Sequence, residues 1–151
     1  MSEMSNLYKT ALLRLGLAEF ERNFLEQVGY SLFSQKDAFR RLQLAVFNNE
    51  PFYSYTSLLG SSITVEFNWE DEITTLTYLE SCIDMTMSDF LAWLSYTDLL
   101  LAPIIPLGSL VELDRELLPE DLVEEMDATK VPCMATIMGR RIISGPDDKE
   151  Y

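Results

Sequence analysis

The chain has 151 residues, no histidine, and 25 acidic against 11 basic side chains, which gives a formal net charge of −14. Without histidine, the usual general base, the Ser-His and Cys-His dyads and the commonest zinc ligand are all excluded. Hydrophobic residues make up 48% and aromatic residues 11% of the chain, so global disorder is excluded as well. At this length, one compact domain overall is the default expectation.

The acidic charge is concentrated in the middle of the chain. Residues 51–129 hold sixteen acidic side chains and a single basic one, Arg115, whereas residues 1–50 hold six of each kind. Nucleic-acid backbones need clustered Lys and Arg, and an anionic membrane surface repels acids, so we expect neither as a ligand. The charge predicts either an ordinary acidic surface or an acidic face that docks a protein partner with a basic surface.

The sequence also predicts the cellular location of the protein and the state of its two cysteine thiols. No apolar run reaches the roughly 18 residues of a membrane span, and the polar N-terminus does not resemble a signal peptide. We therefore expect a cytoplasmic protein. Cys82 and Cys133 are flanked by apolar residues outside any CxxC pattern, so we expect buried, free thiols.

The first fifty residues predict helices. Apolar residues recur at three- and four-residue steps over 6–28, where Gly16 can split the segment into two helices and Gly29 fits a C-terminal stop. Ser34 can cap a second segment, whose apolar face runs to Phe47 and ends before Pro51.

Residues 52–102 mix strand and helix patterns. Residues 52–59 are ambiguous, while 63–69 alternate strictly and predict a strand with Ile63, Val65, Phe67 and Trp69 inward. A helix is expected after Asp71 and Glu72, with its apolar face at Ile73, Leu76, Leu79 and Ile83. A cap-like pattern at 86–89 then opens an apolar helix that contains Trp93 and Leu94, against which we expect the strand to pack. The fold class is therefore α+β: a mainly helical region, 1–102, with one strand near 62–69 and a small antiparallel sheet in the chain overall.

Residues 103–151 predict a small β-rich region with an acidic helical insert. The strand 110–113 should pair antiparallel with residues 136–142, and a short helix, 119–126, starts at Pro119. The alternation suggests that strand 110–113 is mostly buried on both faces. A two-stranded hairpin is marginal in water, and an open edge can accept a strand from another molecule. We expect either a homodimer through that edge or a strand added by a partner.

Candidate chemistry is sparse. The triplet Glu70-Asp71-Glu72, placed at a helix start, lacks the converging oxygens and glycine turn of a cation loop, and Ser109 has no GxSxG context. We therefore expect no catalytic residue, no metal and no cofactor, and we predict that the protein is not an enzyme.

Partner-binding residues are proposed on charge alone. Four exposed acids are expected on the insert helix, and Arg140 and Arg141 form a basic spot among the acids. The two arginines could grip a carboxylate or phosphate, or could pair with the acidic insert. The four acids are Glu120, Asp121, Glu124 and Glu125.

A turn, a strand and a corner recur in the last third: Pro106–Ser109, Leu110–Leu113 and Ile137–Arg140. These features resemble an uncharacterised domain family found in Gram-positive type VII secretion loci that encode LXG toxins. The match is limited to about residues 103–151. The resemblance implies that neighbouring genes encode an antibacterial toxin, its immunity protein and small adaptor-like partners.

These observations together predict a non-catalytic cytosolic binding protein, an adaptor or chaperone-like partner of a type VII-secreted LXG toxin. One alternative is an immunity protein that neutralises a toxin by binding its catalytic domain. A second alternative is an acidic inhibitor or nucleic-acid mimic.

Overall fold

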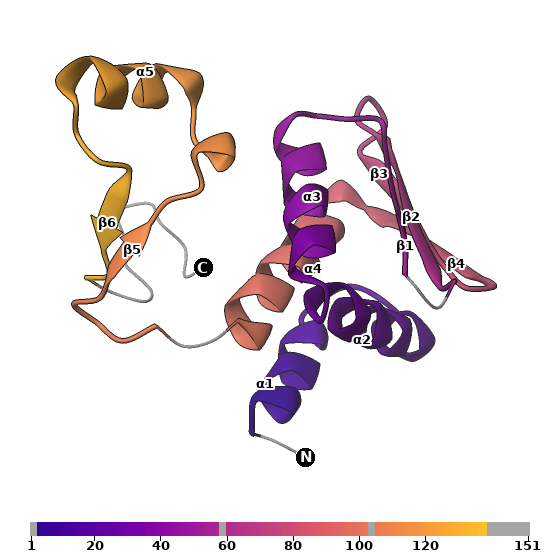
Figure 1. The fold of residues 1–151 in the computed structure, drawn as a ribbon. Helices are drawn as coiled ribbons and strands as arrows, with labels where there is room; N and C mark the ends of the chain where they lie inside the picture. Colours follow the sequence, from indigo (N-terminus) through magenta and orange to yellow (C-terminus); the bar gives the residue numbers. More distant parts are fainter. Residues whose placement is uncertain (1–2, 58–59, 103–104, 139–151) are drawn as a thin grey trace, which may run out of the picture. The chain divides into compact units, whose positions relative to one another are not determined.

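The computed structural model describes residues 3–57, 60–102 and 105–138. The chain divides into two compact units, residues 1–102 and 103–151 (Figure 1). The first unit contains four helices and a four-stranded antiparallel sheet, and the second contains a two-stranded sheet and one α-helix. The α+β class predicted from the sequence is confirmed.

Three helices open the first unit: α1 (Glu3–Leu12), α2 (Glu19–Phe33) and α3 (Lys36–Phe47). The segment over 6–28 is indeed split, because the chain leaves α1 before Gly16 and re-enters a helix at Glu19. The Glu21 carboxylate accepts a hydrogen bond from the Ala18 backbone N–H at 2.6 Å, which satisfies one of the free donors at the start of α2.

Gly29 does not end α2; it lies buried inside the helix, which continues to Phe33. The expectation of a stop there was wrong because tertiary packing decides this position. A Cβ atom at Gly29 would lie 2.1 Å from the Tyr8 hydroxyl oxygen of α1. Only glycine, which has no Cβ atom, fits where α1 and α2 approach closely. The low helix propensity of glycine makes this position of α2 less favourable than alanine would, but the close packing requires it.

Ser34 does not cap α3, contrary to the sequence expectation. Its hydroxyl donates to the Ser31 carbonyl at 2.7 Å, at the end of α2, and Gln35 occupies the position before α3 without a side-chain cap. The hydroxyl satisfies one of the carbonyls that the end of α2 leaves free. The predicted end of α3 at Phe47 is confirmed.

The sheet is a meander in the order β1 (Phe52–Thr56), β2 (Ser62–Asn68), β3 (Ile73–Tyr78) and β4 (Ser81–Thr86). The predicted strand is β2, in which Ile63, Val65 and Phe67 are buried. Trp69 lies just past the strand end and is half-buried. The ambiguous segment 52–59 supplies β1.

The helix expected after Asp71 is wrong, because residues 73–86 form the hairpin β3–β4. Ile73, Leu76, Leu79 and Ile83 fit a helical spacing, but only Leu76 and Ile83 are buried. Residues 73–77 are rich in β-branched side chains, and β2 offers an edge on which Leu76 pairs with Val65. Leu79 takes a positive φ of 55° in the two-residue turn between the strands.

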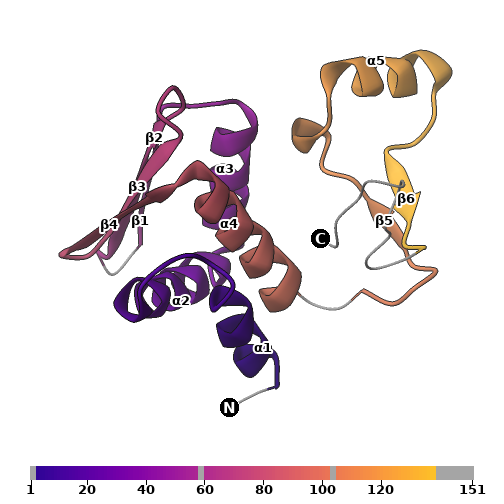
Figure 2. The same cartoon turned by 180° about the vertical axis from the view of Figure 1, so that it is seen from behind.

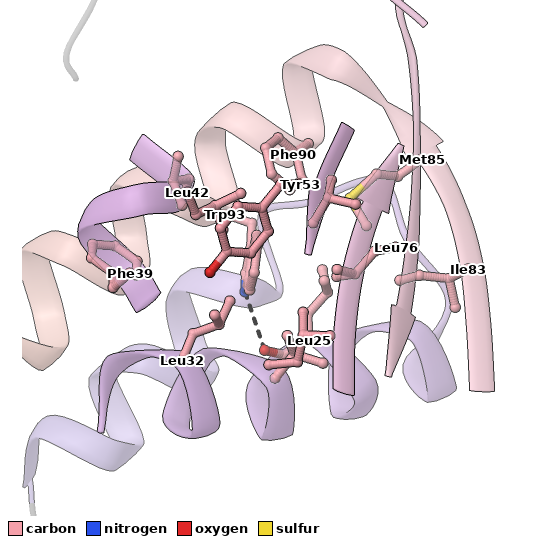
Figure 3. Packing of buried hydrophobic residues seen from close by; sticks show 14 of the residues in the cluster. Leu25, Leu32, Phe39, Leu42, Tyr53, Leu76, Ile83, Met85, Phe90 and Trp93 are labelled. Carbon is pink, nitrogen blue, oxygen red and sulfur yellow. Dashed lines mark hydrogen bonds between the residues drawn. The ribbon is translucent and has the colours of Figure 1, made fainter. Parts of the chain in front are cut away.

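The fourth helix, α4 (Met87–Leu101), begins as its sequence predicts. The Thr86 hydroxyl accepts from the Asp89 backbone N–H at 3.1 Å. The predicted packing of the strand on this helix is also confirmed, since the Phe67 and Phe90 rings meet edge to face at 5.4 Å between centroids. Figure 3 shows the side chains of α2, α3 and α4 converging on the sheet, with the Trp93 indole donating to the Leu25 carbonyl at 3.1 Å.

Within the first unit, the sheet forms one layer and the helices form the other (Figures 1 and 2). Ile83 and Met85 of β4 point into the core, so the alternate residue Cys82 is exposed. The expectation of a buried thiol is therefore wrong for Cys82, and Cys133 in the second unit is only half-buried; both cysteines are free. The outward side chains of the sheet are mainly polar, including Ser54, Thr64, Glu66, Thr75, Thr77 and Asp84.

The second unit is built on the hairpin of β5 (Leu110–Glu112) and β6 (Met134–Thr136), which pair antiparallel. The connection holds a 3-10 turn, η1 (Arg115–Leu117), and α5 (Glu120–Thr129). The predicted antiparallel pair around an acidic helix is confirmed, but β6 shares only Thr136 with the expected range 136–142. Residues 139–142 of that range lie outside the described residues. Burial on both faces is wrong: Leu110 is 62% exposed, and alternate positions are only half-buried.

Candidate interaction surface

The second unit presents its apolar side chains instead of enclosing them. Over residues 105–138 no side chain is fully buried, whereas the first unit contains a continuous core. Exposed apolar side chains that gather into one contiguous patch are typical of interaction sites. The exposed set consists of Ile105, Leu107, Leu110, Leu122, Val131, Met134 and Met138.

The four acids predicted as partner-binding residues lie together on α5, and all four are exposed. Glu120 and Asp121 occupy the first turn, where the helix dipole favours negative charge. Glu124 and Glu125 each follow a like charge by four residues, and such pairs destabilise a helix. The arrangement therefore leaves a concentrated negative charge that the helix itself does not neutralise.

Arg115 neutralises a different acid. Its guanidinium binds both carboxylate oxygens of Asp127 at 2.7 Å, which joins η1 to the last turn of α5. This hydrogen bonding raises the pKa of the Arg115 guanidinium. In the part of the second unit that the structure describes, none of the four acids predicted as partner-binding residues makes an ion pair.

The sequence predicted that the four acids lie exposed on one helix, as they do on α5, but it did not indicate the Arg115–Asp127 pair. Arg115 stands out as the single base among the acids of residues 51–129, yet a separation of twelve residues is no regular helical or strand spacing. Arg140 and Arg141, the other predicted partner-binding residues, lie outside the described residues, so their pairing with the insert stays a prediction.

The hairpin has two unequal faces. Val111 and Ala135 lie opposite each other on a half-buried face, while Leu110 and Glu112 project from the exposed face of β5. In both views of the fold, α5 lies at the end of the insert away from the hairpin (Figures 1 and 2). Among the described residues, no third strand extends this sheet.

The remaining polar features of the first unit are structural. Glu70, Asp71 and Glu72 lie in the β2–β3 turn and not at a helix start, and the Asp71 carboxylate accepts from the Asn68 amide at 2.7 Å. Within residues 3–57, 60–102 and 105–138, no group of three His, Cys, Asp or Glu side chains is arranged to hold a metal ion.

The buried tyrosines also have structural roles. The Tyr53 hydroxyl donates to the Ala38 carbonyl at 2.7 Å, and burial raises the pKa of Tyr53 to about 12. Burial likewise raises the pKa of Tyr8, whose hydroxyl lies 2.7 Å from the Thr97 hydroxyl and accepts from the Trp93 indole at 3.0 Å. Both hydroxyls are enclosed and already bonded, so they hold helices and sheet together and are not free to take part in chemistry.

Comparison of the chain with family models, curated proteins and solved structures finds no match. Across the described residues, none of the helices combines the length and the apolar character that crossing a bilayer requires.

Proposed function

We propose that the protein is a non-catalytic, stoichiometric binding partner of a protein with a basic surface, and that the second unit carries the binding surface. One observation carries this proposal. Residues 105–138 fold into defined elements without a single buried side chain, and they expose apolar residues together with the four acids Glu120, Asp121, Glu124 and Glu125, none of which makes an ion pair. A partner that covers this surface would supply the core that these residues lack among themselves.

The electrostatics of the same segment specify the kind of partner. Residues 105–138 contain eight acidic and two basic side chains, a net charge of −6. Arg115 is already engaged by Asp127. A basic surface would relieve the repulsion on α5 and would be attracted over a distance, which speeds encounter.

The resemblance of residues 103–151 to the type VII-associated family suggests the biological setting. In that setting the protein is a cytoplasmic adaptor or chaperone-like partner of an LXG toxin. A second candidate function is an immunity protein, and the four clustered acids of α5 that make no ion pair favour it, because they could block a basic active site. The two candidates differ in which part of the toxin is bound.

Co-purification with the two halves of an LXG toxin from the same locus separates these candidates. An adaptor should bind the N-terminal export half, and an immunity protein should bind the C-terminal toxic half. Association should slow as salt rises, because exposed charges are screened beyond about 10 Å at 0.1 M ionic strength. Failure of the full-length chain to bind either half, at low or moderate salt, would refute the proposal.

Charge-reversal variants locate the surface. Replacing Glu120, Asp121, Glu124 and Glu125 with Lys should weaken binding and leave the first unit folded. The matched control reverses four exposed acids of the first unit and changes the net charge by the same amount. If both quadruple variants lose binding equally, net charge and not α5 is responsible. The control residues are Glu66, Glu70, Glu72 and Glu80.

A further inference from the structure

The outer edge of β5 carries backbone groups that the hairpin does not use. The Ile137 N–H donates to the Ser109 carbonyl at 2.9 Å, and the Leu113 N–H donates to the Cys133 carbonyl at 2.9 Å. In an antiparallel pair, bonded and non-bonded positions alternate along each strand. Leu110 and Glu112 fall between the bonded positions, so their N–H and C=O groups point away from β6.

The outer edge of β6 is less available. The Met134 N–H already donates to the Pro132 carbonyl at 2.8 Å, and Pro132 itself has no N–H to offer. Within β6, which spans Met134–Thr136, only Thr136 keeps an outward N–H of the kind that Leu110 and Glu112 provide. Among the described residues, β5 is therefore the better edge for receiving a further strand.

The side chains beside that edge indicate which strand would fit. The half-buried Val111 would be covered by apolar residues at alternate positions of an added strand. On the opposite face, the exposed Glu112 would attract a basic residue, and the acidic α5 helix lies in the same connection. A segment that alternates apolar and basic side chains satisfies both faces.

We propose that an extended segment of the partner, alternating apolar and basic residues, adds to the hairpin as a third strand beside β5. The inference rests on the proposed role as a partner of a basic protein and specifies how that protein is held. A third strand turns a marginal two-stranded sheet into one that can be stable, and main-chain hydrogen bonds supply affinity.

Amide hydrogen exchange, followed by NMR on the full chain, tests the edge directly. The Leu110 and Glu112 amides should exchange rapidly in the free protein. A short peptide of alternating lysine and valine should slow both amides by about tenfold or more, the factor expected from protection by added backbone hydrogen bonds. A peptide of alternating glutamate and valine, which has the same β propensity pattern and the opposite charge, should leave them unchanged.

Proline variants at directly opposed positions provide matched controls. Leu110→Pro removes an outward N–H of β5, and Thr136→Pro removes the outward N–H opposite it on β6. Leu110→Pro should lower the affinity for the lysine–valine peptide and for the bound toxin half by about tenfold. Thr136→Pro should retain binding, and Leu110→Ala, which shortens the side chain but keeps the N–H, should lose less affinity than Leu110→Pro. A proline at Ile137 is unsuitable, because that residue donates a hydrogen bond inside the hairpin.

Each other outcome overturns the inference. Protected Leu110 and Glu112 amides in a free monomer would show that the chain itself occupies the edge. Protection that appears with a concentration-dependent dimer, detected by sedimentation, would show that a second copy occupies it. Equal protection by both peptides would remove the charge specificity. If a toxin half binds Leu110→Pro as well as wild type, this inference fails while the proposed function stands; if no toxin half binds the wild type, the proposed function itself fails.

Discussion

Trp93 in the first unit and Leu110 in the second are both large apolar side chains, yet the first is fully buried and the second is 62% exposed. Their surroundings explain the difference. Trp93 projects from a helix onto a four-stranded sheet, with two further helices beside it, whereas Leu110 belongs to a two-stranded hairpin that no other described strand extends. An apolar residue stabilises a fold only where enough elements meet to remove it from water.

The two units also differ in the groups that they leave available for binding. The buried hydroxyls and the indole of the first unit already have hydrogen-bond partners, so that unit can act as a stable scaffold. Over residues 105–138, the second unit keeps the four acids Glu120, Asp121, Glu124 and Glu125, several apolar side chains and one strand edge available. Free groups of this kind are what a binding surface requires.

The two units should differ most in how much the free energy of unfolding falls when one apolar residue is truncated in each. Phe67→Ala removes a ring that is 5% exposed and packs on Phe90, so we expect a loss of about 3–5 kcal/mol in the free energy of unfolding. Leu110→Ala should change it by less than about 0.5 kcal/mol, as at most exposed positions. Urea denaturation of both variants provides the measurement. A loss below about 1 kcal/mol for Phe67→Ala would contradict the burial of that ring.

A smaller loss of stability should follow from disturbing the close approach of α1 and α2. Gly29→Ala would place a methyl group against the Tyr8 hydroxyl, and we expect a loss of about 1–3 kcal/mol from overpacking. Tyr8→Phe removes the hydroxyl oxygen at 2.1 Å and leaves the ring carbon at 3.0 Å. The double variant should therefore lose less than the two single variants predict by addition. Strict additivity in thermal or urea unfolding would show that the two positions do not meet.

A smaller effect should separate helix stability from binding in the second unit. Glu124→Lys and Glu125→Lys convert two like-charge pairs into favourable ones, worth roughly 0.2–0.5 kcal/mol per pair. Exchange of the α5 amides should slow, while affinity for the basic partner proposed above should fall. If binding and helix stability decrease together, the two acids support the fold of α5 and not the interaction.

Asp98 gives the last prediction, which depends on pH. It lies in the last turn of α4, and desolvation raises the pKa of its carboxyl group. A raised pKa in the folded state means that the charged carboxylate destabilises the fold at neutral pH. Asp98 is exposed, so desolvation alone contributes little, but its negative charge also stands at the unfavourable end of the helix dipole. Asp98→Asn should stabilise the protein at pH 7 by about 0.3–1 kcal/mol, as removal of such a charge does.

That gain should shrink as the pH falls through the folded pKa towards the unfolded value of about 3.9, because the wild-type carboxyl then becomes neutral as well. Unfolding measured at neutral and at acidic pH provides the check. A gain that is independent of pH would show that the charge of Asp98 is not its cause.

Local chemistry by itself determined several elements of this protein. The alternation over 63–69 fixed which side of β2 is buried, and the Thr86 cap fixed the start of α4. The acidic composition of 119–126 placed the exposed helix α5 between two strands that pair. Each of these signals depends only on a residue and its near neighbours, so it can be recognised without knowledge of the fold.

Tertiary structure decided the rest. Residues 73–86 became strands because β2 offered a pairing edge, although their apolar spacing also fits a helix. Position 29 is a glycine inside α2, and not a helix stop, because the Tyr8 hydroxyl of α1 occupies the space that a Cβ atom would fill. Leu110 stayed exposed because residues 105–138 contain too few elements to enclose it. In all three cases the deciding contact, or the lack of one, involves residues that are distant in sequence, and no local pattern carries that information.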